Sequence, residues 1–268
     1  MKKFRLIIVC LLSFLGTYGQ SLSLFKTINL PKGVNDIELD QFGNIYLVLG
    51  SELRKLTPVG EFEASFADPN FGDIDHIDLL NPMAPLIYYA DFNQLRILDN
   101  RLNQSQSLSL LNLGFNDPKL IAYSDQNRFW VYDQSADRLV QFSLAENRIV
   151  NQGPIIRQLE IPKGIVSALF SGFNNSLIYL QGQGFVSFDA LGAKKEFIPE
   201  QDSLQSFDFD NRRWLSLNEQ GLIKVYPINN SKKPKTYLSP ISKVNKLILR
   251  DLNLYFWVDD KLYQYRFD

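Results

Sequence analysis

The sequence predicts an all-β fold, a six-bladed β-propeller in which the N-terminal strand closes the last blade. Three observations predict it. A short apolar-aromatic step recurs six times along the chain. Strand-like segments and turns surround each recurrence. One spare strand precedes the first repeat, and the last repeat lacks one. No long stretch of the sequence has apolar residues at convincing helical spacing.

The recurring aromatic residue defines the repeat length. Its intervals along the chain are 42, 42, 49, 35 and 41 residues, close to the length of one propeller blade of four short strands. The six positions are Tyr46, Tyr88, Trp130, Tyr179, Trp214 and Tyr255.

Each aromatic step lies between two other predicted strands. The preceding strands are NDIELD from Asn35, HIDLL from His76, KLIAYS from Lys119, SALFS from Ser167, LQSFDF from Leu204 and NKLILR from Asn245. The following strands are LRKLT from Leu53, LRILD from Leu95, LVQFS from Leu139, FVSFD from Phe185, LIKVY from Leu222 and LYQYR from Leu262. Turns rich in Gly, Asn, Asp and Gln separate them, which indicates antiparallel hairpins, and each repeat has room for a fourth strand.

The two ends of the chain complement each other. The sixth repeat ends at Asp268 after its third strand, whereas residues 21–30 (SLSLFKTINL) form a strand-like segment that belongs to no repeat. We therefore expect residues 21–30 to be the outer strand of the last blade, which removes two exposed sheet edges. A β-sandwich or an open array of sheets is the alternative.

The first residues have the layout of a secretory signal peptide. Lys2, Lys3 and Arg5 precede an apolar run of about ten residues, which is shorter than the roughly 20 residues that span a bilayer. We expect residues 1–19 to be the signal peptide and residues 20–268 to be the propeller domain, with no membrane span after cleavage. An uncleaved membrane anchor is the alternative, and we expect Cys10 to be part of the apolar run rather than a lipid-attachment site.

Removal of residues 1–19 changes composition and charge. The only cysteine is lost, and 25 basic residues remain against 29 acidic ones, a formal charge of −4. This disfavours a nucleic-acid partner, which requires a basic surface. An exported, cysteine-free chain is typical of a bacterial envelope, so the expected location is the periplasm or cell surface of a Gram-negative-type bacterium.

One segment carries a family resemblance. The run Asp40-Gln41-Phe42-Gly43-Asn44-Ile45-Tyr46-Leu47 resembles the D-x-x-G-N-I-Y-V segment of NHL-type and related six-bladed propellers, in which Asp and Gly form a tight turn before a strand. The resemblance implies the architecture across most of the chain, while its specific letters cover about eight residues. It implies no activity, because propellers serve many functions.

Residues for catalysis are few. His76 is the only histidine, so neither a Ser-His-Asp triad nor a histidine zinc site is expected, and we interpret His76 as structural. The polar segment 68–76 departs from the calcium-loop pattern, since Leu79 replaces its final Glu, and is interpreted as a connector. No bound cofactor is expected. Calcium in the channel is the alternative, as in lactonase-like propellers, with candidate ligands Asp36, Asp75, Asn116, Asp117, Asp208 and Asn245.

The predicted binding surface is one face of the propeller, formed by the connectors that leave each outer strand and by the turns between the two middle strands. Two of these connectors, residues 30–34 and 161–165, repeat each other. Phe71 and Phe92 are the predicted anchors for a protein partner; the alternative is that either ring folds back to cap the core. The candidate residues are Lys32, Asn70, Phe71, Asp91, Phe92, Phe115, Asn116 and Lys163.

These observations favour a non-enzymatic, exported propeller that binds a protein partner. The partner is expected in the cell envelope, in an outer-membrane secretion or assembly complex, and the propeller would act as a scaffold or subunit. Two alternatives remain: a calcium-dependent hydrolase resembling the lactonases, and a propeller that binds a glycan or another small ligand.

Overall fold

The protein is described by a computed structural model. The described residues are 21–125, 127–172, 174–200, 202–210, 212–227 and 234–267. The predicted signal peptide, Cys10 included, lies outside them. No helix in the described residues is long and apolar enough to cross a membrane.

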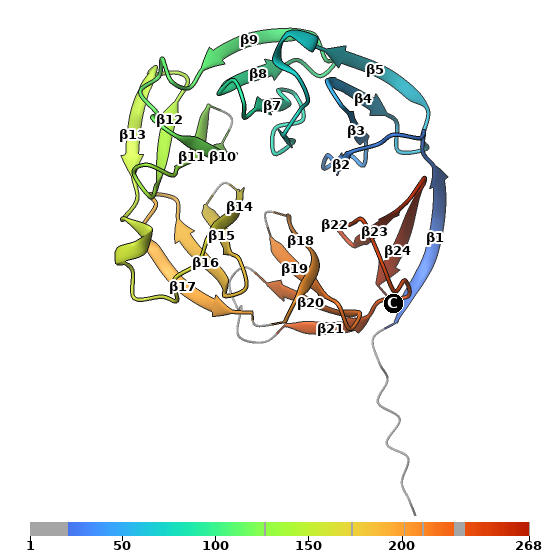
Figure 1. The fold of residues 1–268 in the computed structure, drawn as a ribbon. Helices are drawn as coiled ribbons and strands as arrows, with labels where there is room; N and C mark the ends of the chain where they lie inside the picture. The colour runs from blue at the N-terminus through green and yellow to red at the C-terminus, as the bar shows by residue number, and fades with distance from the viewer. Residues whose placement is uncertain are drawn as a thin grey trace, which may run out of the picture.

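Six four-stranded antiparallel sheets stand in a ring around a central channel (Figure 1). The first blade contains β2 (Asp36–Leu39), β3 (Ile45–Leu49), β4 (Glu52–Leu56) and β5 (Phe62–Ala67). The second contains β6 (His76–Asp78), β7 (Leu86–Tyr89), β8 (Gln94–Leu98) and β9 (Gln104–Ser109). The third contains β10 (Pro118–Asp125), β11 (Arg128–Asp133), β12 (Arg138–Ser143) and β13 (Arg148–Gln152). The fourth blade contains β14 (Val166–Ser171), β15 (Asn175–Leu180), β16 (Gly184–Asp189) and β17 (Lys194–Pro199). The fifth contains β18 (Leu204–Asp210), β19 (Arg213–Asn218), β20 (Leu222–Pro227) and β21 (Lys235–Leu238). The sixth contains β22 (Lys246–Arg250), β23 (Asn253–Val258), β24 (Lys261–Phe267) and β1 (Leu22–Asn29). The predicted fold class is confirmed.

The N-terminal strand closes the ring, as predicted. β1 pairs antiparallel with β24 from Leu22 opposite Phe267 to Asn29 opposite Lys261, with one irregularity between Leu24 and Lys26. The pairing joins the two ends of the described chain, which lie together in Figure 1. The last blade thereby has the same four strands as the other five.

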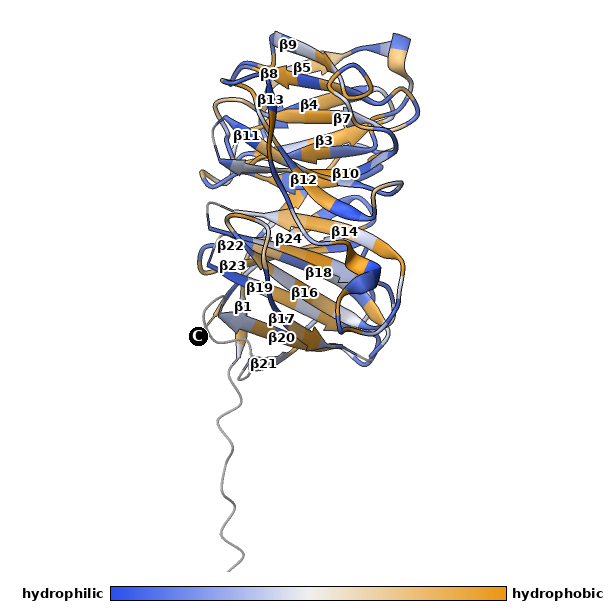
Figure 2. Ribbon diagram, turned by 90° about the vertical axis from the view of Figure 1, so that its left-hand side faces the viewer, coloured by the Kyte–Doolittle hydropathy of each residue, from blue (hydrophilic) through white to orange (hydrophobic). Residues whose placement is uncertain are grey.

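The six periodic aromatic residues all lie in the core. Each belongs to the second strand of its blade, and their exposed fractions range from 0% for Tyr46 to 7% for Tyr255. Apolar clusters join adjacent blades: Leu86 of the second blade and Val131 of the third share one cluster. Figure 2 shows the disc edge-on, with the apolar strands running across its thickness. Burial between blades therefore explains why one aromatic residue recurs in every repeat.

The turn that carries the NHL-type resemblance is held by Asp40. Its Oδ1 accepts hydrogen bonds from the backbone N–H groups of Phe42 and Asn44, both at 2.9 Å, and Oδ2 accepts one from the Asn44 side chain at 2.8 Å. Gly43 has a φ of +82°, which favours glycine. Asp99 accepts hydrogen bonds in the same pattern from the N–H groups of Arg101 and Asn103. The same kind of turn therefore also occurs at a position that lacks the D-x-x-G-N-I-Y-V motif.

Candidate functional site

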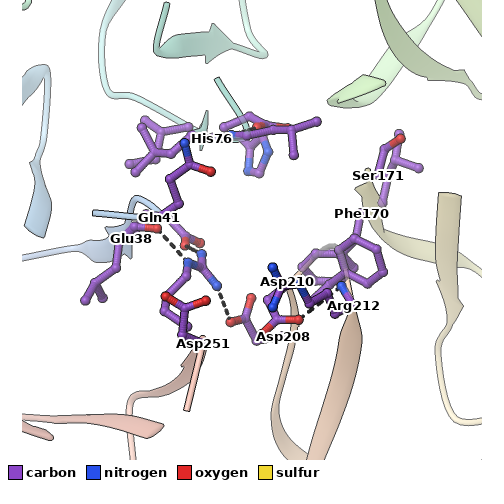
Figure 3. Close-up of a pocket in the computed structure, with 17 residues that line it drawn as sticks. Glu38, Gln41, His76, Phe170, Ser171, Asp208, Asp210, Arg212 and Asp251 are labelled. Atoms are coloured by element: carbon purple, nitrogen blue, oxygen red, sulfur yellow. Dashed lines mark hydrogen bonds and ion pairs between the residues drawn. The ribbon is translucent and has the colours of Figure 1, made fainter. Parts of the chain in front are cut away.

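A cavity of about 370 Å³ occupies the central channel (Figure 3). Its walls are the innermost strands of the first, second, fourth, fifth and sixth blades, together with the turns that follow them. We call the face on which these turns lie the pocket face. The opposite face, which carries the sequence-predicted binding residues, is the connector face.

Arg250 is the centre of an ionic network in this cavity. Its guanidinium lies 3.0 Å from Glu38 Oε2 and 2.7 Å from Asp208 Oδ2, and its Nε donates to the Leu39 carbonyl at 2.6 Å. Lys246 lies 2.5 Å from Glu38 Oε1 and 2.9 Å from Asp36 Oδ1. Because Arg250 belongs to the sixth blade, it connects the first blade to the fifth.

Carboxylates in the channel also bind backbone of the next blade. Asp208 Oδ2 accepts the N–H of Leu249 at 2.7 Å, and Asp78 Oδ2 accepts the N–H of Tyr123 at 2.8 Å. The innermost strands have one edge without a neighbouring strand, so these side chains satisfy backbone donors that the sheets leave unpaired. Asp78 Oδ1 accepts a second N–H, from Leu80, at 2.7 Å.

The carboxyl groups of the cavity differ in pKa. Burial raises the pKa of Asp208 to about 6, an increase that Arg250 opposes and Glu38 reinforces. Burial also raises the pKa of Asp78, against the hydrogen bond from Leu80. For Glu38, burial is the largest effect and would raise the pKa, but Lys246 and Arg250 together outweigh it and lower the pKa. Lys246 and Arg250 therefore stabilise the charged form of Glu38 more than Arg250 stabilises that of Asp208.

The raised pKa of Asp208 predicts a pH-dependent stability difference. A carboxyl group that titrates near pH 6 when folded and near 3.9 when unfolded contributes stability below about pH 3.9, and this contribution is lost as the pH rises through about 6. We expect the unfolding free energy of the wild type, minus that of Asp208→Asn, to fall by roughly 2 kcal/mol between pH 4 and 7. Urea titrations across this range measure it, and a difference that is flat or rises with pH would contradict the assignment.

His76 lies on the cavity wall of the second blade, at the first position of β6 (Figure 3). Its side chain is half-buried, and its imidazole has no hydrogen-bond partner among the described residues. It is close enough to Glu38 and Asp78 to affect both carboxyl groups electrostatically. Spectroscopic signals of the single histidine can therefore report on binding in this cavity.

Exposed apolar side chains lie on three of the turns that border the cavity. Phe42, Met83 and Leu252 are 62%, 60% and 69% exposed, and they lie in the turns that follow the innermost strands of the first, second and sixth blades. We call these three residues the rim. Each of their turns also contributes a residue to the cavity wall. Each of these turns contains an apolar residue among polar ones, which is a signal for the rim in the sequence, but the predicted binding residues all lie on the connector face.

The connector face brings together some of the predicted binding residues. Phe71 and Phe92 form an edge-to-face pair with ring centroids 5.5 Å apart, and Arg96 lies 4.2 Å above the Phe71 ring. Phe92 is 49% exposed, while Phe71 is half-buried against Tyr89. Asn70 and Asp91 are their exposed neighbours in the chain.

The remaining candidates are dispersed. Lys32, Asn116 and Lys163 are exposed on three other connectors. Phe115 requires a correction: its side chain is only 2% exposed and packs against Phe142 in the core, with ring centroids 6.4 Å apart. Phe115 is therefore not available as a surface contact.

Four of the six candidate calcium ligands are engaged by other groups of the chain. Asp36 and Asp208 are paired with Lys246 and Arg250, Asn245 accepts the N–H of Asp259, and Asp75 accepts the N–H of Ala90. Within the described part of the chain, no three His, Cys, Asp or Glu side chains are grouped so that they could hold a metal ion. The cations that pair with Glu38 are Arg250 and Lys246, and the cation that pairs with Asp208 is Arg250.

Comparison with known proteins agrees on the fold alone. No protein-family model matches the sequence, and no curated protein sequence does. The WD40 domain of Neurospora crassa Pan2 superposes with a TM-score of 0.56 at 8% identity, over 92% of this chain and 96% of that one. Chaetomium thermophilum Raptor superposes with a TM-score of 0.63 at 10% identity, over 93% of this chain but 30% of Raptor. The chain is a six-bladed β-propeller similar in structure to WD40 propellers.

Proposed function

We propose that this propeller is a non-enzymatic protein-binding scaffold and that its partner docks on the pocket face. The observation that carries the proposal is the rim: three large apolar side chains, each at least 60% exposed, on turns of three consecutive blades. Exposed apolar side chains gathered around a concave centre are characteristic of interaction sites. A rigid ring of sheets holds these turns in fixed positions, which lowers the entropy lost on binding.

The cellular setting is a second part of the proposal. Residues 1–19 have the signal-peptide layout, so we place the mature chain in the periplasm or at the cell surface of a Gram-negative-type bacterium, as a subunit of an outer-membrane secretion or assembly complex. Kinship with NHL-type propellers belongs to this proposal too, and it rests on residues 40–47.

The chemistry of the cavity favours binding over catalysis. Glu38 and Asp208 are engaged by Arg250, and Asp78 is engaged by two backbone N–H groups, so the carboxylates already hold adjacent blades together. We propose that the protein needs no cofactor. The calcium-dependent hydrolase would instead require bound calcium, and the glycan binder would use Phe92 and Phe71 on the connector face as its aromatic platform.

Rim substitutions test the proposal. We expect the double variant Phe42→Glu/Met83→Glu to recover its envelope partner at least about tenfold less well, because charges replace two apolar contacts of the kind that dominate interfaces. The measurement is affinity capture of tagged protein from gently solubilised envelopes of the native host, quantified by mass spectrometry.

A matched control uses Phe92→Glu on the connector face, an exposed aromatic residue outside the rim. All three substituted positions are exposed, so each variant should unfold within about 0.5 kcal/mol of the wild type. Undiminished capture by the rim variant, with loss in Phe92→Glu, would move the interface to the connector face. A calcium-containing monomer with no partner would favour the hydrolase.

A further inference from the structure

The cavity wall beneath the rim is acidic. Asp251, Glu38 and Asp78 belong to the sixth, first and second blades, the three blades that carry the rim residues Leu252, Phe42 and Met83. The three blades that carry the rim therefore also contribute three carboxylates to the cavity wall. The opposite wall carries Arg212 of the fifth blade and Phe170 of the fourth (Figure 3).

The cations of the channel leave part of this charge uncompensated. Five carboxylates line the cavity, namely Glu38, Asp78, Asp208, Asp210 and Asp251, against the guanidinium groups of Arg212 and Arg250. Lys246 and Arg213, which lie behind the wall, pair with Glu38 and Asp210. Asp78 and Asp251 have no cationic side-chain partner among the described residues.

Asp78 combines burial with this lack of a counterion. Burial raises the pKa of its carboxyl group, although two backbone N–H groups donate to it. Two donated hydrogen bonds leave acceptor capacity on a carboxylate, which offers about four lone-pair sites. A cation that enters the cavity beside Asp78 would relieve the cost of burying its charge.

We infer that the cavity receives the cationic side chain of a lysine or arginine from the docked protein, while apolar residues flanking it contact the rim. The inference rests on the proposed function and adds the chemistry of the docking segment. The cavity, at about 370 Å³, lies within the range of 300–1,000 Å³ found for ligand sites. An arginine suits the site best, because its planar guanidinium donates to several oxygens at once.

His76 provides a direct measurement. It is the only histidine of the chain and lines the cavity, so its ring gives a single set of NMR signals. The probes are capped tripeptides, Ac-Gly-Arg-Gly-NH₂ and its lysine counterpart, with citrulline and glutamate versions as the neutral and anionic controls. We expect saturable shifts of the His76 signals with the arginine and lysine probes, half-maximal near about 1 mM.

Single variants give opposite effects. Asp251→Asn should weaken binding of the arginine probe about two- to fivefold, whereas Arg212→Gln should strengthen it by a similar factor, because it removes a repelling charge. Both side chains are exposed, so the fold should persist, and Asp259→Asn on the connector face is the matched control. Equal shifts with the citrulline probe, or binding of the glutamate probe alone, would overturn the inference.

The two proposals fail separately. If the rim variant loses its partner but no cationic probe reaches the cavity, the inference is wrong and the docking face stands. If the probes bind but capture of the partner is independent of the rim, the docking face is wrong.

Discussion

Replacing Arg250 by Met should lower the free energy of unfolding by about 3–5 kcal/mol. The substitution keeps much of the side-chain volume but leaves Glu38 and Asp208 without their shared cation, and these carboxylate side chains are only 14% and 3% exposed. Removing one partner of a buried ion pair costs this much because the Asp208 carboxylate is then neither solvated nor paired, while Glu38 keeps only its pair with Lys246. The Leu39 carbonyl also loses the Arg250 Nε donor.

Equilibrium urea unfolding at pH 7 measures the effect of Arg250→Met. Arg54→Met is the control, since Arg54 also pairs with a carboxylate, Glu52, but its side chain is 35% exposed and the pair lies within one blade. We expect the control to lose less than about 1 kcal/mol. A loss that small in Arg250→Met would mean that the channel network does not stabilise the ring.

Deleting the N-terminal strand should have an even larger effect. A chain that begins at Pro31 lacks β1 and with it Ile28 and Leu30, which are 6% and 7% exposed in the cluster between the sixth and first blades. Burial of these two side chains alone accounts for about 3–6 kcal/mol. The deletion also exposes the edge of β24. We expect no cooperative unfolding transition and concentration-dependent association, measured by circular dichroism and analytical ultracentrifugation.

An engineered disulfide tests ring closure without deletion. Thr27 and Tyr263 are directly opposite each other in β1 and β24, and the chain from residue 20 onward has no cysteine of its own. Opposed residues of an antiparallel pair have Cα atoms about 4.5–5.5 Å apart, within disulfide range. Thr27→Cys/Tyr263→Cys should therefore oxidise readily, whereas Lys26→Cys/Tyr263→Cys, one residue out of register, should not. The reverse result would contradict the register of β1.

The sequence allowed prediction of the inner three strands of every blade but not of the fourth. The inner strands are buried and alternate or run apolar, as in β3 (Ile45–Leu49). The outer strands are mostly exposed, and β9 (Gln104–Ser109) reads QSQSLS, so their hydrogen bonds rather than their side chains define them. Only β1 was located in advance, because ring closure required a partner for β24.

The cavity was harder to predict than the fold because its walls come from five blades. Glu38 and Arg250 are 212 residues apart in the sequence, and they meet only when β1 brings the sixth blade beside the first. Turn composition pointed to the connector face, where Phe71 and Phe92 do form a pair. Phe115 shows the limit of that reasoning, since an aromatic residue in a connector can fold back into the core.

Ring closure and the proposed interface are physically linked. The rim residue Leu252 belongs to the sixth blade, in which β1 pairs with β24, and Phe42 belongs to the first blade, into which the chain runs from β1. Arg250 connects the same two blades inside the channel. Disulfide closure at positions 27 and 263 should therefore leave partner binding intact, because it preserves the spacing of the rim turns.

Site-specific photocrosslinking tests partner docking on the pocket face most directly. A photoreactive amino acid is placed in turn at Phe42, Met83, Phe92 and Leu191, all exposed, and the crosslinks formed in intact cells of the native host are identified by mass spectrometry. Phe42 and Met83 are rim positions, Phe92 lies on the connector face, and Leu191 lies on the pocket face in the fourth blade, away from the rim. The proposal predicts that one envelope protein crosslinks at Phe42 and Met83 and not at Phe92. A partner that crosslinks at Phe92 alone would contradict docking on the pocket face.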